Sequence, residues 1–315
     1  MEILTHADPG RLEQLRAAEE FFWLDLRDPD EDELTVLNEQ LGLHPLALED
    51  TKEWHQRAKV EPYEDHVFMV FYTVAAAADG PSTRSMEVHL YISGDFVVTA
   101  RRGDCAEMDL LRGRLGPSPE ADSEDYLVYR ILDGLTDAYF PLIDATEQRI
   151  DALEGDVLSR PRRDQLERIY RLKQEVHAFE RRVIAQRDYL PAAVDAIMAL
   201  PSLSRGTRTY LRDVADHLVQ VAGELHRQST DLGALTDTFF NANANKLNES
   251  TSRLSVLATF FVVATLITGF FGQNFGWLTD AIDSRTDFLV FGVGGLVLPL
   301  GLLSVYFWRR RDDWL

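Results

Sequence analysis

The chain has 315 residues and a formal net charge of −20, from 52 acidic and 32 basic side chains. Residues 254–315 carry four basic and five acidic side chains, so nearly all of the negative charge, −19, belongs to residues 1–253. A basic footprint is needed to bind nucleic acid, so we expect no nucleic-acid partner. The single cysteine, Cys105, excludes an intrachain disulfide and a zinc site built from cysteines.

Residues 1–122 are predicted to form a domain of mixed α and β structure. Apolar runs rich in β-branched and aromatic residues predict strands, and a proline followed by acids predicts the first turn of a helix. The predicted elements are a strand at 21–26, a helix opening at 28–34, a strand at 66–74, and a hairpin of 86–93 with 96–100 closed by Gly94-Asp95. Pro117 and Pro119 mark the end of this domain.

Residues 123–253 are predicted to form long, charged helices, because their apolar residues recur at steps of three and four. The pattern breaks at Pro161, where a second helix begins. We expect that helix to end at Tyr189, since Pro191 follows and proline interrupts a helix. The polar side chains predicted to lie on solvated helix faces are Asp133, Asp137, Asp144, His177 and His226.

The segment from Thr207 to Phe271 contains no proline. As a single helix, its 65 residues would extend about 100 Å. A helix of that length needs partners along it, and this one would continue without a break into an apolar stretch. We therefore expect an oligomer in which this stalk helix surrounds a central axis.

Two apolar stretches, 254–271 and 288–308, contain no charged residue. Each approaches the roughly 20 residues that a membrane-spanning helix needs, although the core of a large soluble protein can also hold such runs. The flanks favour the membrane, because Arg253 precedes the first stretch, Arg309–Arg311 follow the second, and the connection between them is acidic. Basic flanks stay in the cytoplasm, so we expect a multi-pass protein of the cell membrane with both termini cytoplasmic.

One face of the first apolar stretch carries small, hydroxyl or amide side chains, and the opposite face is bulky. Small residues permit close helix packing, and hydroxyl groups can instead line a path for hydrated ions. The pattern alone leaves both interpretations open. The residues of this face are Asn248, Thr251, Ser255, Thr259 or Ala258, Val262, Thr265 or Leu266, and Gly269.

The spanning stretches contain no Asp, Glu, Lys, Arg or His, so neither a proton relay nor an inner-sphere metal cage can be built there. No Gly-x-x-x-x-Gly-Lys-Ser/Thr loop is present, which excludes an ATP-driven motor of that kind. No arrangement of Ser, His and Asp or of Cys and His suggests catalysis, so we expect no enzyme and no catalytic residue.

The connection between the two stretches resembles the signature of the CorA-type divalent cation transporters. Gly272-Gln273-Asn274 stands where that family usually has Gly-Met-Asn. The runs His44–Asp50 and His55–Glu61 resemble the family's N-terminal motif, and Tyr210–His217 resembles its stalk-helix motif. The C-terminal arginines followed by Trp314-Leu315 resemble its basic tail. The resemblance covers the whole chain.

This resemblance implies a fold and a set of sites. The fold is an α+β cytoplasmic domain (1–122), long helices including the stalk (123–253) and a two-helix transmembrane domain (254–315), assembled as a funnel-shaped homopentamer. A regulatory cation site between subunits falls on Asp213. The implied selectivity filter is Gly272, Gln273 and Asn274, and the implied pore lining is Asn248, Thr251, Leu254, Val262 and Thr265. Weaker candidates for the regulatory metal are His217, Glu87 and Asp79.

The resemblance implies channel-like transport of a divalent cation, with Mg²⁺ as the first expectation for both the transported and the regulatory ion. Transport would be driven by the membrane potential and gated by intracellular cation. Gln273 replaces the usual methionine, and relatives with altered triplets, including the ZntB-type transporters, carry other ions. The alternatives are therefore transport of Zn²⁺, Co²⁺ or Ni²⁺, with or without coupling to protons, and a membrane-anchored sensor that does not conduct.

Overall fold

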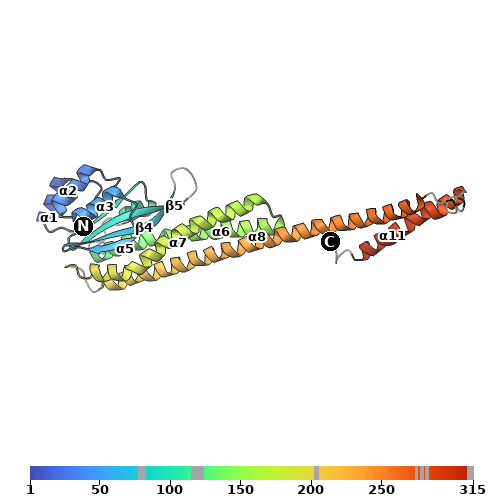
Figure 1. The fold of residues 1–315 in the computed structure, drawn as a ribbon. Coiled ribbons are helices and arrows are strands. Elements are labelled where there is room, and N and C mark those ends of the chain that lie inside the picture. The colour runs from blue at the N-terminus through green and yellow to red at the C-terminus, as the bar shows by residue number, and fades with distance from the viewer. Residues whose placement is uncertain are drawn as a thin grey trace. The chain divides into compact units, whose positions relative to one another are not determined.

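The computed structural model describes residues 1–76, 83–114, 124–201, 206–273, 276, 280 and 284–310. The chain divides into two compact units (Figure 1). The first unit comprises Met1–Gly155 with Arg163–Leu235, and the second comprises Asp156–Arg162 with Thr236–Leu315. The first unit therefore groups the predicted N-terminal domain with most of the long helices, while the predicted boundaries after residues 122 and 253 stay predictions.

The first unit is built on a mixed sheet of six strands in the order β1-β2-β6-β5-β4-β3. The pairs β1·β2 and β2·β6 are parallel, and the remaining pairs are antiparallel. The hairpin predicted around Gly94-Asp95 is confirmed, with Ile92 opposite Val97. The strands are β1 (Glu2–Leu4), β2 (Phe22–Arg27), β3 (Lys59–Pro62), β4 (His66–Ala76), β5 (Thr83–Ser93) and β6 (Phe96–Arg101).

Helices α1 (Pro9–Ala17), α2 (Glu31–Leu41) and α3 (Pro45–Glu53) lie together beside the sheet (Figure 1). Each begins where a side chain caps its first turn: Asp8, Asp30 and His44 accept backbone N–H groups there. Their buried apolar residues join those of the strands in one core. Burying a large apolar side chain stabilises the fold by about 1.5–3 kcal/mol, so this core holds the three helices on the sheet.

The first unit also contains α4 (Ala106–Arg114), α5 (Glu124–Asp137), most of α6 (Tyr139–Ser159), α7 (Arg163–Ile197) and the first part of α8 (Thr207–Phe271). Helices α5 and α7 pack on the sheet. Thr73 on β4 donates to the carbonyl of Leu135 at 2.6 Å, and Tyr189 donates to the carbonyl of Val70 at 3.1 Å. These bonds, the first buried and the second partly buried, hold α5 and α7 against β4.

The predicted end of the second long helix at Tyr189 is wrong, because α7 continues through Pro191 to Ile197. A proline inside a helix removes one hydrogen bond and costs about 3 kcal/mol. Leu190, Ala193 and Ile197 are fully buried on the same helix face, and their burial offsets that cost. The uninterrupted helix predicted from Thr207 is confirmed, with the same bounds.

The second unit contains the C-terminal part of α8, the short helix α10 (Arg285–Asp287), a π-helical turn at Phe288–Val293 and α11 (Gly294–Arg309). By length and composition, the helices Thr207–Phe271 and Arg285–Arg309 are apolar enough to cross a membrane, and neither apolar window is buried. The predicted stretches 254–271 and 288–308 fall within them. Phe260 on α8 contacts Phe307 on α11, with ring centroids 6.0 Å apart.

Candidate cation cluster and pore segment

Three potential metal ligands meet where α5 lies beside the first part of α8. Asp213 and His217 are one turn apart on α8, so both side chains project from one helix face. Asp133 reaches the same place from α5. Each residue offers one ligand atom, and these atoms lie within 4.8 Å of one another. Two carboxylates and an imidazole at this spacing could bind one divalent cation.

The contacts around these residues leave ligand atoms available. Nδ1 of His217 is 3.3 Å from Oδ1 of Asp133 and 3.6 Å from Oδ1 of Asp137. Among the described residues, neither Oδ1 of Asp133 nor Nδ1 of His217 has a hydrogen-bond partner, although both atoms are buried. Buried polar atoms normally have such partners. An unsatisfied oxygen and nitrogen facing each other are therefore suited to a shared cation.

The electrostatics of this cluster favour a bound cation. Burial raises the pKa of Asp133, and the nearby Asp137 raises it further, against the opposing effects of His217 and Arg130. Burial, with the charges of Asp133 and Asp213, raises the pKa of Tyr129 to about 12. The Tyr129 hydroxyl donates to Oδ2 of Asp213 at 3.2 Å. A divalent ion would relieve the concentration of negative charge that adds to the effect of burial in both pKa shifts.

The donor set suits two classes of cation. Mg²⁺ prefers oxygen ligands and retains several waters, so it would use the two carboxylates and leave the rest of its shell hydrated. Imidazole suits zinc, copper, iron and nickel. His217 therefore widens the range of ions that this cluster could bind.

The sequence interpretation of Asp133 was wrong. It was predicted to lie on a solvated face with Asp137 and Asp144, and those two residues are exposed. Asp133 is only 5% exposed. Its position between Leu132 and Leu135, both fully buried, is the sequence signal that could have identified it.

His177 and His226, also predicted to be solvated, remain partly exposed but share one buried carboxylate. Nδ1 of His226 is 2.8 Å from one oxygen of Glu180, and Nδ1 of His177 is 3.1 Å from the other. Burial opposes ionisation of Glu180, yet the hydrogen bonds from His226 and His177 hold its pKa below the ordinary value. This contact ties α7 to α8.

The predicted acidic partners of Asp213 are placed as follows. Asp79 lies outside the described residues. Glu87 on β5 accepts the backbone N–H of Gln56 at 3.0 Å and the hydroxyl of Tyr72 at 3.2 Å, and its carboxylate lies 2.7 Å from Nε2 of His89. These internal contacts engage the Glu87 carboxylate within the chain, and its role as a metal ligand stays a prediction.

The predicted pore-lining residues occupy one side of α8 in the second unit. In the single chain all five are exposed, and Leu254 and Val262 are 67% and 66% exposed. On the opposite side, Phe260 packs against α11. The hydroxyl groups of Ser255 and Thr259 donate to backbone carbonyls one turn earlier in α8, so they do not join α8 to α11. The predicted lining residues therefore lie on the part of α8 that α11 leaves uncovered, which also carries the exposed Phe261 and Leu266.

The predicted filter residues come directly after the end of α8 in the chain. Helix α8 ends at Phe271, and the backbone N–H groups of Gly272 and Gln273 donate to the carbonyls of Thr268 and Phe270. A side-chain carbon on Gly272 would lie 3.1 Å from the Thr268 carbonyl oxygen, so the tight end of the helix favours glycine. Asn274 lies outside the described residues.

Comparison with known families decides the broader identity. The family described as CorA-like Mg2+ transporter protein matches residues 18–311. The chain belongs to this family. The CorA family consists of divalent cation transporters rather than enzymes, and the two apolar helices agree with a membrane protein of this kind.

Members of the CorA family match nearly the whole chain. The cobalt/magnesium transport protein CorA of Thermotoga maritima is 29% identical over 282 residues, covering 89% of this chain and 79% of that protein. The putative metal ion transporter YfjQ of Bacillus subtilis is 27% identical over 321 residues, covering 99% and 95%. The zinc transport protein ZntB of Yersinia pseudotuberculosis is 24% identical over 261 residues, covering 82% and 77%.

The fold agrees with a solved structure of the family. The complete structure of the CorA magnesium transporter from Methanocaldococcus jannaschii superposes with a TM-score of 0.77 at 22% identity, covering 93% of this chain and 91% of that one. Similarity at this identity establishes the fold. It leaves the transported ion and the number of subunits as predictions.

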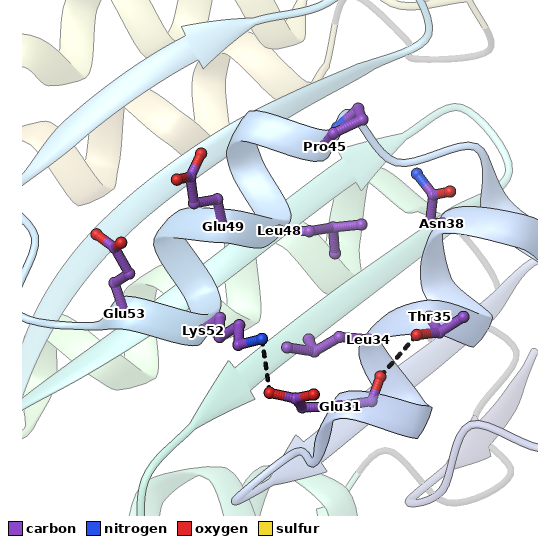
Figure 2. A pocket seen from close by; sticks show the side chains of 9 residues that line it. All are labelled: Glu31, Leu34, Thr35, Asn38, Pro45, Leu48, Glu49, Lys52 and Glu53. Atoms are coloured by element: carbon purple, nitrogen blue, oxygen red, sulfur yellow. Dashed lines mark hydrogen bonds and ion pairs between the residues drawn. The ribbon is translucent and has the colours of Figure 1, made fainter.

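The run His44–Asp50, which resembles the N-terminal motif of the family, forms part of a further pocket. Figure 2 shows this pocket of about 770 Å³ between α2 and α3. Lys52 pairs with Glu31 at 2.6 Å, while Glu49 and Glu53 lie along α3 with no described ion pair. The pocket is therefore acidic like most of the first unit, and such a surface raises the local concentration of cations.

Proposed function

We propose that this chain is one subunit of a homopentameric, channel-like transporter that conducts Mg²⁺ across the cell membrane, with both chain termini in the cytoplasm. The observation that carries the proposal is the uncovered side of α8, where Thr251, Leu254, Val262 and Thr265 face away from α11. Five copies of this side would enclose a pore. The number five comes from the family resemblance.

The proposed pore combines a hydrophobic constriction with a polar outer entrance. Leu254 would form a ring of apolar side chains, and such a ring gates by dewetting. The amides of Gln273 and Asn274, with Gly272 keeping the backbone compact, would capture a hydrated ion at the outer entrance. Mg²⁺ dehydrates reluctantly, and amides without carboxylates allow it to retain its waters and leave.

The membrane potential supplies the driving force in this proposal. Moving one charge through 100 mV is worth about 2.3 kcal/mol, so a divalent ion gains about twice that amount. The stretches 254–271 and 288–308 contain no Asp, Glu, Lys, Arg or His, which is consistent with passage of a hydrated ion without a proton relay.

We propose that the cluster of Asp133, Asp213 and His217 is the regulatory cation site. When internal Mg²⁺ is abundant, binding there would favour the closed state, because a ligand shifts an equilibrium only through its different affinity for the two states. Asp79 and Glu87 remain the predicted acids from a neighbouring subunit. The unsatisfied Oδ1 of Asp133 supports a cation site in this position.

A second candidate function is transport of Zn²⁺, or of Co²⁺ or Ni²⁺, with or without proton coupling. The imidazole of His217 in the cluster favours it, together with Gln273 in place of methionine and the similarity to a zinc transport protein. A non-conducting cation sensor is the alternative outside transport, because the same cluster could signal without a pore.

Reconstitution separates these functions. The full chain is placed in liposomes, an inside-negative potential is imposed, and uptake of Mg²⁺, Zn²⁺, Co²⁺ and Ni²⁺ is measured with and without a pH gradient. We expect Mg²⁺ uptake that follows the potential and ignores the pH gradient. Preference for Zn²⁺ or dependence on the pH gradient would support the second candidate, and no uptake of any ion would support the sensor.

The residue that replaces methionine is tested in the same assay. We expect Gln273→Met to change the relative uptake of Mg²⁺ and the transition metals while leaving assembly unchanged. An unaltered order of ions would exclude Gln273 as a determinant of selectivity.

A further inference from the structure

A smaller pocket of about 290 Å³ lies in the first unit, where α7 passes the sheet. Three arginines from separate elements line it: Arg84 on β5, Arg102 just after β6, and Arg182 on α7. The proposed transport function uses one residue of this pocket, Glu87, as a candidate regulatory acid, and gives the three arginines no role. Its charge is opposite to that of the surrounding unit, which carries nearly all of the chain's negative charge.

The arginines are not neutralised within the part of the chain that the structure describes. Among the described residues, these arginines contact the backbone carbonyls of Arg102 and Ala178 and the rings of Trp54 and Tyr72, and none of them forms an ion pair with an acidic side chain. Glu87, the one carboxylate among the described residues of the pocket wall, is already engaged by Gln56, Tyr72 and His89. The pocket therefore presents three guanidinium groups whose charge the chain leaves available to a ligand.

Aromatic rings hold two of these arginines in place without removing their charge. The guanidinium of Arg102 lies over the ring of Trp54 at 5.0 Å from its centre, and that of Arg182 lies over the ring of Tyr72 at 5.1 Å. Cation–π contact orients a guanidinium group while its N–H donors remain able to bind an anion. The two side chains are thus ordered in advance.

Arg84 and Ser85 complete the wall. Nη2 of Arg84 donates to the carbonyl of Arg102 at 3.4 Å, in space that Gly103 leaves open: a side-chain carbon on Gly103 would lie 2.6 Å from Nη2. Gly103 also has a φ of +82°, which favours glycine. Oγ of Ser85 is buried and has no hydrogen-bond partner among the described residues. A buried hydroxyl with no partner is suited to an oxygen atom of a ligand.

The backbone beside the pocket is strained. Trp54 and His55 are consecutive non-glycine residues with φ values of 57° and 58°, and both line the pocket. Strained backbone persists only where surrounding contacts hold it, and it concentrates at binding sites. Here Gln56 is bonded to Glu87, and the ring of Trp54 stacks on His89 at 4.6 Å. This strain places Trp54 under Arg102.

We propose that this pocket binds a small phosphate-bearing anion and ties α7 to the sheet when occupied. Guanidinium groups bind phosphate oxygens through paired N–H donors, and three of them match the charge of a pyrophosphate or of a phosphorylated metabolite. The volume lies at the small end for ligand pockets. Arg102 and Arg182 already cover the rings of Trp54 and Tyr72, so these rings do not stack on another part of the ligand. The phosphate is therefore the group that the pocket recognises.

Calorimetric titration of the full chain in detergent, free of divalent cations, tests the proposal with inorganic phosphate, inorganic pyrophosphate and adenosine triphosphate. We expect saturable binding of one pyrophosphate per subunit and a rise in melting temperature with its concentration, because a ligand of the native state stabilises it. Arg102→Gln and Arg182→Gln should each weaken binding at least ten-fold. Arg181→Gln, at the neighbouring exposed position of α7, should leave it unchanged.

The variant Arg84→Gln distinguishes a loss of binding from a loss of folding. Arg84 is exposed and makes one described hydrogen bond, so its variant should keep the melting temperature and weaken pyrophosphate binding. Tighter binding of adenosine triphosphate than of pyrophosphate would identify a nucleotide as the source of the phosphate, and equal or weaker binding would identify a free phosphate compound. Absence of saturable binding for all three anions, or binding that survives all three pocket substitutions, would overturn the proposal.

Discussion

The two units of the chain treat their large apolar side chains in opposite ways. In the first unit, Trp23 and Tyr91 are fully buried among residues of the same chain. In the second unit, Phe261 and Trp308 are 72% and 74% exposed, and α11 has no buried residue. The first unit builds its own core. The second unit leaves its apolar side chains exposed in the single chain, as expected for helices that cross a membrane.

This difference separates two sources of stability. The first unit is stabilised by internal burial and by hydrogen bonds such as that between Trp23 and Thr99, at 3.0 Å. The described helices of the second unit satisfy their backbone bonds internally, as a membrane requires. Packing between such helices depends on close contact and interhelical bonds rather than on exclusion of water. Substitutions should therefore have different effects in the two units.

The largest effect is expected from the core of the first unit. Trp23→Ala removes a fully buried ring and leaves the hydroxyl of Thr99 without its donor, so we expect a loss of about 3–5 kcal/mol in the free energy of unfolding. Trp308→Ala is the control in the second unit and should change it by less than about 0.5 kcal/mol. Denaturant titration of the full chain in detergent measures both. Equal effects would contradict the contrast between the units.

The next largest effect is expected at the cluster of Asp133, Asp213 and His217 in the first unit. Asp133→Asn removes a buried carboxylate whose pKa burial has raised, so the metal-free chain should become more stable. The same change should abolish the stabilisation by Mg²⁺, about 2.7 kcal/mol when the ion is at 100 times its Kd. Asp144→Asn, at an exposed position of α6, should alter neither quantity. Melting curves with and without Mg²⁺ check this. An unchanged response to Mg²⁺ in Asp133→Asn would show that this cluster does not bind the ion.

A smaller effect with a defined pH dependence is expected at Glu180. Hydrogen bonds from His226 and His177 lower its pKa in the folded chain, so the ionised form stabilises the fold above the ordinary value of 4.5. That contribution is lost as the pH falls through the lowered value. Glu180→Gln should therefore reduce the free energy of unfolding by about 1–3 kcal/mol at pH 7.

The difference in the free energy of unfolding between wild type and Glu180→Gln should decline below about pH 4.5. It should vanish once Glu180 is protonated in both the folded and the unfolded chain. Glu167→Gln, in an exposed pair with Arg171 on the same helix, is the matched control and should have an effect below about 1 kcal/mol. A difference for Glu180→Gln that stays constant from pH 3 to pH 7 would show that the lowered pKa plays no part.

Much of the fold follows from local patterns along the sequence. The hairpin at Gly94-Asp95, the helix Thr207–Phe271 and the two apolar stretches depend on turn residues, on the absence of proline and on composition, which are all local properties. The continuation of α7 through Pro191 was missed because it depends on burial of Ala193 and Ile197 against other elements. Tertiary packing there outweighs the local preference of proline.

The candidate sites divide in the same way. Asp213 and His217 are one helical turn apart, so their spacing was visible in the sequence. The place of Asp133 beside them was not visible in the sequence, because its position is 80 residues before Asp213 in the chain. The arginine pocket brings together three elements, and no spacing within the sequence indicates that Arg84 and Arg182 meet.

The central claim is that the side of α8 left uncovered by α11 lines a water-filled pore, and cysteine accessibility tests it most directly. The only native cysteine, Cys105, is buried and is replaced by serine. Single cysteines are then introduced at Val262 and, as the control, at Phe260, and Mg²⁺ uptake into liposomes is measured before and after a charged thiol reagent. The account predicts that the reagent modifies Val262→Cys and blocks uptake, while Phe260→Cys is unaffected. Modification and block at Phe260→Cys, with Val262→Cys inert, would contradict it.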